Sequence, residues 1–146
     1  MKYTCEVDIN QPVDKVIALF DNPDNLKKWM DGLQHFEHLS GEPGQPGAKS
    51  RLKFKMGKRE MEMIETVTVR NLPEEFSGTY EMEGTLNTIK NKFIPISDTK
   101  TRYVTENEFQ FDNLMMKILG FLMPGMFKKQ SMKYLESFRK FAESQP

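Results

Sequence analysis

The sequence predicts an α+β fold in which a curved antiparallel sheet wraps around a long C-terminal helix. Two observations support this prediction. From Arg51 to Phe111 the chain is a series of strand-like segments joined by short connections, and short connections force neighbouring strands to run antiparallel. From Asn113 to Ser144 the pattern is helical instead, because apolar residues in its second half recur on one helical face.

The composition narrows the class of function. The 146 residues are of ordinary size for one domain, spanning residues 1–146. Lys and Arg together number 21, as do Asp and Glu, which argues against a nucleic-acid partner because phosphate binding requires a basic excess. No apolar run is long enough for a membrane span. The single cysteine and an N-terminus without the apolar stretch of a signal peptide lead us to expect a cytoplasmic protein.

The part of the chain before the meander predicts one strand and two short helices. Tyr3 to Asn10 alternates apolar and polar residues, which is typical of a half-buried strand. Pro12 stands at the start of a helix, where its missing N–H is not needed. Asn22-Pro23 repeats this start signal for a very short helix that ends near Trp29. A Gly- and Pro-rich loop from Ser40 to Ser50 then leads into the meander.

Tight turns in the meander allow the strand register to be predicted, because residues directly opposite each other share a face of the sheet. The expected strands are Arg51 to Met56, Glu60 to Val69, Phe76 to Glu83, Thr85 to Ile96 and Thr101 to Phe111. The turns predict the pairs Phe54 with Met61, Leu52 with Met63, Glu65 with Tyr80, Val67 with Gly78, Tyr80 with Asn87 and Gly78 with Ile89. A four-residue last turn predicts Phe93 opposite Val104 and Asn91 opposite Glu106.

The last strand does not fit this register completely. The shared face is mostly apolar, with Glu65, Glu106 and a few other polar side chains embedded in it. Phe109 and Phe111, however, fall on the opposite parity. Either a bulge shifts the register of this strand, or the two rings contact the start of the final helix.

The final helix is unusually apolar in its first half. From Leu114 to Phe127, ten of fourteen residues are apolar and one is charged. A helix that is apolar nearly all round must be covered on more than one side, so we expect the concave sheet to receive it. Pro124-Gly125 predicts a kink or a brief break. This segment, or the Ser40 to Ser50 loop, would have to move to open an enclosed cavity.

The opening of the chain resembles that of the START-like superfamily. The residues that carry the resemblance are Val7-Asp8-Ile9, Pro12, Val16, Leu19-Phe20-Asp21, Pro23 and Trp29. The superfamily has a helix-grip fold and includes polyketide cyclases/dehydratases, lipid-transfer domains, plant hormone-binding proteins and Hsp90-activator-like domains. The order of elements extends the resemblance over the whole chain. It implies a cavity between the sheet and the long helix, but no particular activity, because the fold hosts carriers, sensors and enzymes alike.

A ligand in such a cavity is expected to contact residues from the strands, the short helices and the final helix. These are Trp29, Phe54, Met63, Glu65, Tyr80, Asn87, Ile89, Asn91, Phe93, Glu106, Met115, Leu119, Leu122 and Met123. A carboxylate among apolar neighbours must be paired, hydrogen-bonded or shifted in pKa. Glu65 and Glu106 could therefore anchor a ligand's polar group, or one of them could act as a general acid or base. They could equally hydrogen-bond each other or cavity water, or face solvent if the register differs.

The sequence predicts no metal site and no cofactor. His35 and His38 lie three apart on an expected strand, so they point to opposite faces, and no further Cys or His completes a ligand set. Cys5 has no identifiable base that would make it a nucleophile. The chain has no glycine pattern of the Walker or dinucleotide-binding type.

The favoured function is binding, and with it transport or sensing, of a small hydrophobic molecule. A methionine-rich wall suits a deformable pocket, although methionine also fills ordinary cores. The alternatives are a cyclase/dehydratase-type enzyme that uses a cavity carboxylate and a protein-interaction module resembling the Hsp90-activator domains. The surplus apolar surface from Met115 to Phe127, flanked by Lys117, Lys128 and Lys129, could instead face a second copy in a homodimer or a membrane surface.

Overall fold

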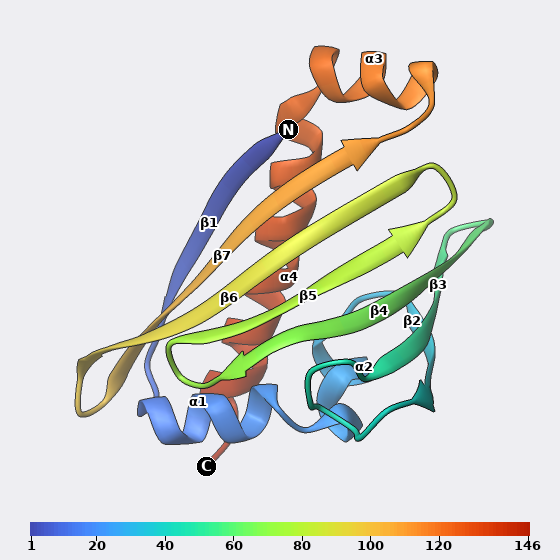
Figure 1. Cartoon of the computed structure of the whole chain (residues 1–146). Helices are drawn as coiled ribbons and strands as arrows, with labels where there is room; N and C mark the ends of the chain where they lie inside the picture. The colour runs from blue at the N-terminus through green and yellow to red at the C-terminus, as the bar shows by residue number, and fades with distance from the viewer.

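A computed structural model of residues 1–146 shows one seven-stranded antiparallel sheet with four α-helices (Figure 1). The strands are β1 (Lys2–Ile9), β2 (Leu33–Ser40), β3 (Lys49–Met56), β4 (Arg59–Asn71), β5 (Glu75–Met82), β6 (Thr85–Ser97) and β7 (Lys100–Phe111). The helices are α1 (Val13–Phe20), α2 (Leu26–Trp29), α3 (Leu114–Leu122) and α4 (Pro124–Glu143), with a 3-10 turn at Pro23–Asn25. The strand order β1-β7-β6-β5-β4-β3-β2 places the first strand beside the last.

The sheet curves around α4, which runs along its concave side (Figure 1). Helices α1 and α2 lie at one end of α4, near the C-terminus, and α3 lies across the other end (Figure 1). This arrangement confirms the predicted α+β helix-grip fold.

The core lies where α1, α2 and α4 meet the sheet, and it is built largely from aromatic rings. Phe20 of α1 lies within 5.0 to 6.0 Å, between ring centroids, of the rings of Trp29, Phe93 and Phe138. Phe138 of α4 is fully buried, and its ring also contacts Trp29 and Tyr103. Such rings bury large apolar areas and prefer the edge-to-face geometry seen for most of these pairs. The core therefore fixes the C-terminal half of α4 on the sheet.

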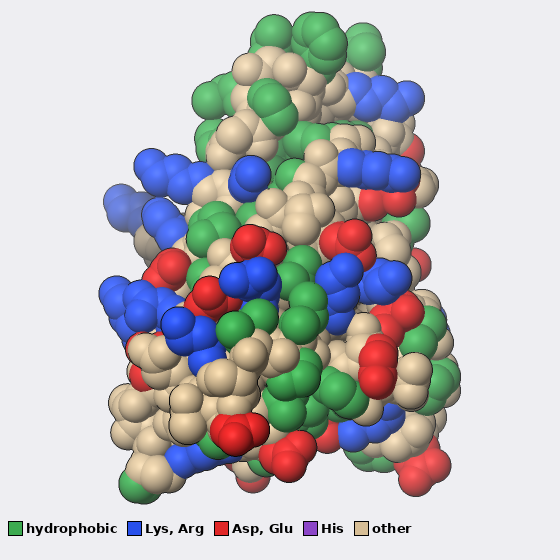
Figure 2. All heavy atoms as spheres, turned by 90° about the vertical axis from the view of Figure 1, so that its left-hand side faces the viewer, with side chains coloured by type: hydrophobic (Ala, Val, Ile, Leu, Met, Phe, Trp, Pro, Cys, Tyr) green, Lys and Arg blue, Asp and Glu red, His purple; other side chains and the backbone are tan.

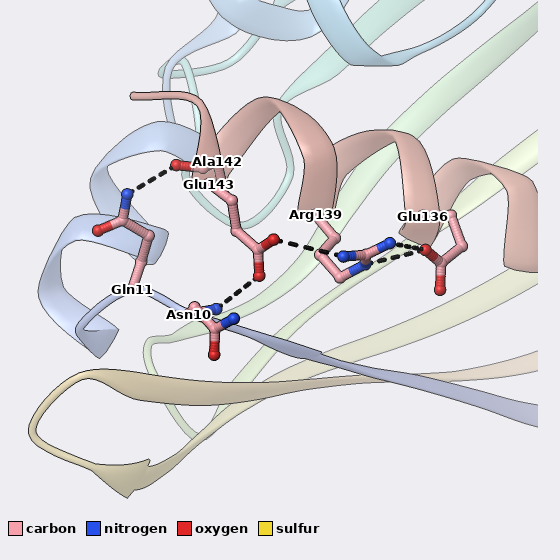
Figure 3. A network of polar contacts seen from close by, with 6 residues as sticks. All are labelled: Asn10, Gln11, Glu136, Arg139, Ala142 and Glu143. Atoms are coloured by element: carbon pink, nitrogen blue, oxygen red, sulfur yellow. Dashed lines mark hydrogen bonds and ion pairs between the residues drawn. The ribbon is translucent and has the colours of Figure 1, made fainter. Parts of the chain in front are cut away.

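Polar contacts hold the same end of α4 to the connection between β1 and α1 (Figure 3). The guanidinium of Arg139 bonds Glu136 at 2.6 Å and Glu143 at 3.3 Å. Glu143 accepts a hydrogen bond from the backbone N–H of Asn10 at 2.8 Å, and Gln11 donates its side-chain N–H to the carbonyl of Ala142 at 2.9 Å. The C-terminal end of α4 is thus tied to the start of the chain.

The residue pairs predicted from the first three tight turns are confirmed, although a bulge between Val67 and Val69 shifts the pairing next to the β4–β5 turn by one residue. Glu65 pairs with Tyr80, and Tyr80 pairs with Asn87; Phe54 likewise lies opposite Met61. These pairs put the predicted side chains on one face of β3, β4, β5 and β6.

The register predicted for β7 is wrong by one residue. Asn91 lies opposite Thr105 rather than Glu106, and Phe93 lies opposite Tyr103 rather than Val104. An irregularity between Pro95 and Ser97 causes the shift, because one extra residue in one strand moves every following side chain to the other face.

The C-terminal segment, expected to be one kinked helix packed against the sheet, contains two separate helices, α3 and α4. Met123 leaves the helical region with φ −132° and ψ 50°, and Pro124 follows at the start of α4. The expected break is therefore present, but the expectation that the sheet receives the apolar half-helix is wrong. Helix α3 turns away across the end of the sheet (Figure 1), and most of its apolar side chains are exposed.

Candidate ligand-binding cavity

A cavity of about 290 Å³ lies between the concave face of the sheet and α4. Of the 24 residues that line it, 17 are hydrophobic. Its volume is close to the lower end of the range for small-molecule pockets, roughly 300–1,000 Å³. A space of this kind favours a small molecule with a mainly apolar surface.

Methionines and aromatic rings make most of the wall. Strands β3, β4, β5 and β6 contribute Phe54, Met56, Met61, Met63, Tyr80, Met82 and Ile89. Helix α4 contributes Phe127, Gln130, Ser131, Tyr134 and Leu135, and α1 and α2 contribute Phe20 and Trp29. Unbranched thioether side chains adapt to irregular shapes, so this wall can adjust to its contents.

Polar side chains form a strip on the cavity faces of β6 and β7. Asn91 accepts a hydrogen bond from the Tyr103 hydroxyl at 3.0 Å. Asn107 donates its amide to the hydroxyl of Thr105 at 3.4 Å. All four residues line the cavity. Burial raises the pKa of Tyr103 well above its ordinary value, so this phenol stays protonated.

Two buried polar atoms in the cavity wall have no hydrogen-bond partner. They are the indole nitrogen of Trp29, which donates, and the side-chain oxygen of Asn87, which accepts. Buried polar atoms in folded proteins nearly always have partners, because leaving one unpaired costs about 1–3 kcal/mol. Each of these atoms has almost no accessible surface, so neither is open to the cavity itself.

Glu65 and Tyr80 form a hydrogen-bonded pair at the cavity wall. The Tyr80 hydroxyl donates to a carboxylate oxygen of Glu65 at 2.5 Å, and Tyr80 lines the cavity. Desolvation raises the pKa of Glu65, and the hydrogen bond from Tyr80 partly opposes this effect. Burial, together with the neighbouring Glu65 carboxylate, raises the pKa of Tyr80 well above its ordinary value. Tyr80 thus contributes a neutral phenol to the cavity wall, and its hydroxyl is hydrogen-bonded to Glu65.

The end of the cavity next to α3 is closed by rings and one methionine. Phe109, Phe127 and Met116 line the cavity there, and the ring centroids of Phe109 and Phe127 are 5.0 Å apart. Tyr3 and Ser131 share a hydrogen bond of 2.6 Å between their hydroxyls at the same edge. Met116 is the residue through which α3 forms part of the cavity wall.

Half of the residues predicted from the sequence to contact a ligand line the cavity. These are Trp29, Phe54, Met63, Tyr80, Asn87, Ile89 and Asn91. Glu65 reaches the cavity wall through its bond to Tyr80. Phe93 is buried in the aromatic core, against Phe20 and Tyr103.

The remaining predicted residues lie elsewhere. Glu106 lies between Thr105 and Asn107 on β7, and these two face the cavity, so strand alternation places Glu106 on the outer face. Met115, Leu122 and Met123 are exposed on α3 and at its end, and Leu119 of α3 is partly exposed. None of these five residues, Glu106 included, lines the cavity. Their placement follows from the register shift in β7 and from the turn of α3 away from the sheet.

Sequence reasoning missed the cavity residues of β7 and of the first turns of α4. Tyr103, Thr105, Asn107 and Phe109 alternate along β7 and line the cavity. The signal was present in the sequence, because Phe109 and Phe111 were recognised as out of step with the predicted register. Their parity is the correct one for the whole strand.

No group of three or more His, Cys, Asp or Glu side chains is arranged to hold a metal ion. None of the helices combines the length and the apolar character that crossing a membrane requires.

Solved structures share the fold at low sequence identity. The aromatase/cyclase ZhuI from Streptomyces sp. R1128 superposes with a TM-score of 0.80 at 11% identity, over 98% of this chain and 93% of its own. Norcoclaurine synthase from Thalictrum flavum, in complex with dopamine and hydroxybenzaldehyde, gives a TM-score of 0.71 at 14% identity, over 100% and 88% of the two chains. A protein of Thermus thermophilus gives 0.73 at 18% identity, over 98% and 94%. These likenesses establish the fold.

The sequence itself carries the family assignment. No curated protein matches the chain. A family profile described as polyketide cyclase / dehydrase and lipid transport matches residues 1–143, which is nearly the whole chain. Together with the helix-grip fold and its apolar cavity, this match shows that the chain belongs to the polyketide cyclase/dehydrase and lipid transport family.

Proposed function

We propose that the protein binds a small, mainly hydrophobic molecule that carries a polar group, in the cavity between the sheet and α4. The observation that supports this most directly is the wall itself, in which 17 of the 24 lining residues are hydrophobic and a strip of polar side chains follows β6 and β7. A ligand with a hydroxyl, phenol or amide group can hydrogen-bond to the side-chain amides of this strip.

The proposed contacts divide into two kinds. Phe54, Met63 and Ile89 enclose the apolar body of the ligand, which stabilises it through the area removed from water. Tyr80 and Asn87 lie opposite each other on β5 and β6, and Asn91 lies farther along β6, so these side chains offer polar atoms that orient the ligand. A protein-interaction module of the Hsp90-activator kind would need no such cavity, so the cavity favours ligand binding over that alternative.

The experiment is native mass spectrometry of the protein purified from its own host, followed by extraction of any bound compound. The test variant is Ile89→Trp, which places a larger side chain in the cavity. Its matched control is Ile94→Trp on the same strand, where the side chain is 39% exposed and does not line the cavity. A bound mass that is present in the wild type and the control, but absent in Ile89→Trp, supports the proposal.

A second measurement covers the case in which Ile89→Trp fails to fold. Trp29 is the single tryptophan and lines the cavity, so its fluorescence reports on cavity contents directly. Titration with a panel of hydroxylated aromatic and isoprenoid compounds should change the emission of the wild type. A clean apo mass, together with no change in emission for any compound, would refute the proposed function.

A cyclase- or dehydratase-type enzyme is the second candidate, and one observation favours it. Tyr80 lines the cavity, and its hydroxyl donates to the Glu65 carboxylate, whose pKa is raised. A phenol backed by such a carboxylate can exchange a proton with a bound substrate. Turnover of an identified ligand would establish an enzyme. Glu65→Gln should then remove the pH dependence of the rate, and Tyr80→Phe should abolish turnover. Binding without turnover would establish a carrier or sensor.

A further inference from the structure

The most exposed apolar surface of the molecule lies on α3 and at its junction with α4. The side chains of Leu114, Met115, Phe121 and Leu122 are between 68% and 85% exposed. Figure 2 shows hydrophobic side chains gathered at the tip of the molecule that α3 forms in Figure 1. A contiguous apolar patch on a projecting helix is typical of a docking site.

This apolar tip is presented in a fixed orientation. The side chain of Asn113 caps the helix by accepting a hydrogen bond from the backbone N–H of Met116 at 2.7 Å. On the inner side, Gly120 is buried against Phe111, and a Cβ at Gly120 would lie 2.8 Å from the Phe111 ring. One face of α3 therefore packs on the end of β7, and the opposite face is left to the surroundings.

The charged side chains within the apolar segment itself are all positive. From Asn113 to Met132 the sequence has no Asp or Glu, and its charged residues are Lys117, Lys128 and Lys129. All three are exposed, and Figure 2 shows basic side chains just below the apolar tip. Asp112 precedes the helix and lies beside the β5–β6 turn, where its N–H bonds the carbonyl of Gly84 at 3.0 Å.

The charge pattern decides between the surfaces that could cover α3. A symmetric dimer formed through α3 would gather these three lysines from each copy with no carboxylate of the same segment to pair them, and unpaired like charges oppose association. An anionic lipid surface offers the complementary arrangement, because the apolar side chains enter the acyl boundary while the lysines meet the headgroups.

We propose that α3 docks the protein on membranes that contain anionic lipid. Phe121, Leu122 and Met115 enter the interface, and Lys117, Lys128 and Lys129 contact the headgroups. Binding is reversible, because α3 has only 9 residues and buries little apolar surface in the lipid.

Docking also affects the cavity, a consequence that rests on the proposed function. Met116 of α3 lines the cavity, so a shift of α3 on the membrane moves one wall of the cavity toward the lipid. The Ser40–Ser50 loop is less free to move, because Arg70 bonds both Asp21, at 2.8 Å, and the carbonyl of Gly44, at 3.3 Å. A hydrophobic ligand would therefore enter and leave at the α3 end.

The test is co-sedimentation of the full chain with vesicles of phosphatidylcholine alone and of phosphatidylcholine with phosphatidylglycerol, at low and high salt and without added ligand. Phe121→Ser should weaken binding to anionic vesicles roughly tenfold or more, because it removes an inserted ring. The control is Ile96→Ser, since Ile96 is 44% exposed near the β6–β7 turn at the other end of the sheet.

A second pair of variants tests the lysines. Lys128→Gln with Lys129→Gln should lower affinity for anionic vesicles about 25-fold, at about fivefold for each lysine. The control, Lys53→Gln with Lys55→Gln, removes the same charge from exposed positions of β3. It should change the affinity for anionic vesicles little. High salt should weaken wild-type binding.

Three outcomes would overturn the proposal. They are no binding to either vesicle, equal binding to neutral and anionic vesicles, and binding that Phe121→Ser leaves unchanged. If sedimentation velocity showed a dimer of the wild type and a monomer of Phe121→Ser, the exposed face of α3 would instead be the interface with a second copy of the chain. Because these assays contain no ligand, their result is separate from that of the cavity experiments.

Discussion

Tyr80 lies directly opposite Glu65 on neighbouring strands and donates its hydroxyl hydrogen to the Glu65 carboxylate at 2.5 Å. The pair links β4 to β5 at the wall of the cavity. In this pair a tyrosine hydroxyl of the cavity wall is hydrogen-bonded to a carboxylate. The raised pKa of that carboxylate makes the stability of the protein depend on pH.

Stability should fall as the pH rises through the range in which Glu65 loses its proton. Desolvation raises the folded-state pKa of Glu65 above its ordinary value of 4.5. Between these two pKa values the folded state holds more protons than the unfolded state, so the free energy of unfolding decreases with pH. Glu65→Gln keeps an acceptor for Tyr80 but does not titrate. The variant should therefore gain stability relative to the wild type as the pH rises above about 4.5.

Urea unfolding across that range measures this difference. The control is Glu81→Gln, because Glu81 is exposed on the neighbouring strand β5. Parallel stability–pH curves for the wild type and Glu65→Gln would contradict a desolvated Glu65 carboxyl with a raised pKa.

Asn87→Leu should stabilise the protein while weakening ligand binding. The side-chain oxygen of Asn87 is buried without a partner, so a leucine of similar size removes that cost, worth about 1 kcal/mol in the free energy of unfolding. The same change deletes a polar contact proposed for the ligand. Thermal unfolding and fluorescence titration of Trp29 would report the two effects separately.

The comparison for Asn87 is Asn91→Leu. Asn91 accepts the hydrogen bond of the buried Tyr103 hydroxyl, so its loss strands a donor and should cost about 1–3 kcal/mol. If Asn87→Leu destabilised the protein as much as Asn91→Leu does, the Asn87 oxygen would have a partner within the protein.

Two phenylalanines of the C-terminal segment should differ sharply in their contribution to stability. Phe138 is fully buried among aromatic rings, and Phe138→Ala should lower the free energy of unfolding by about 3–5 kcal/mol. Phe121 is 85% exposed, so Phe121→Ala should change it by less than about 0.5 kcal/mol. Denaturant titration of both variants makes the comparison, and a large loss for Phe121→Ala would mean that α3 is covered within the monomer.

Two glycines of α3 and α4 should respond in opposite directions to alanine. Alanine normally favours a helix over glycine by about 1 kcal/mol. At Gly125, where an added Cβ meets nothing within 4 Å, the substitution should be neutral or stabilising. At Gly120 the Cβ would lie 2.8 Å from Phe111, so the substitution should loosen α3.

Hydrogen exchange of α3 amides measures this loosening. Protection of α3 should decrease in Gly120→Ala and persist in Gly125→Ala. Unchanged protection in both variants would show that the Phe111 ring moves aside without disturbing the helix.

The sequence by itself determined the element order and most of the sheet register. Tight turns and strict alternation are local features, so the pairing of Glu65 with Tyr80 and of Tyr80 with Asn87 could be predicted from neighbouring residues. The same local signals placed Tyr80 and Asn87 among the candidate contacts, and both line the cavity.

Only the tertiary structure decided the register of β7 and the direction of α3. The irregularity between Pro95 and Ser97 moves the pairing by one residue, which replaces Glu106 with Thr105 on the cavity side. The turn length favours one register and the parity of Phe109 and Phe111 favours the other, and the packing of β7 between β6 and β1 decides between them. The direction of α3 depends on the backbone of Met123 and on the contact between Gly120 and Phe111. Hydrophobicity alone predicted burial for this helix, whereas its position beyond the end of the sheet leaves it exposed.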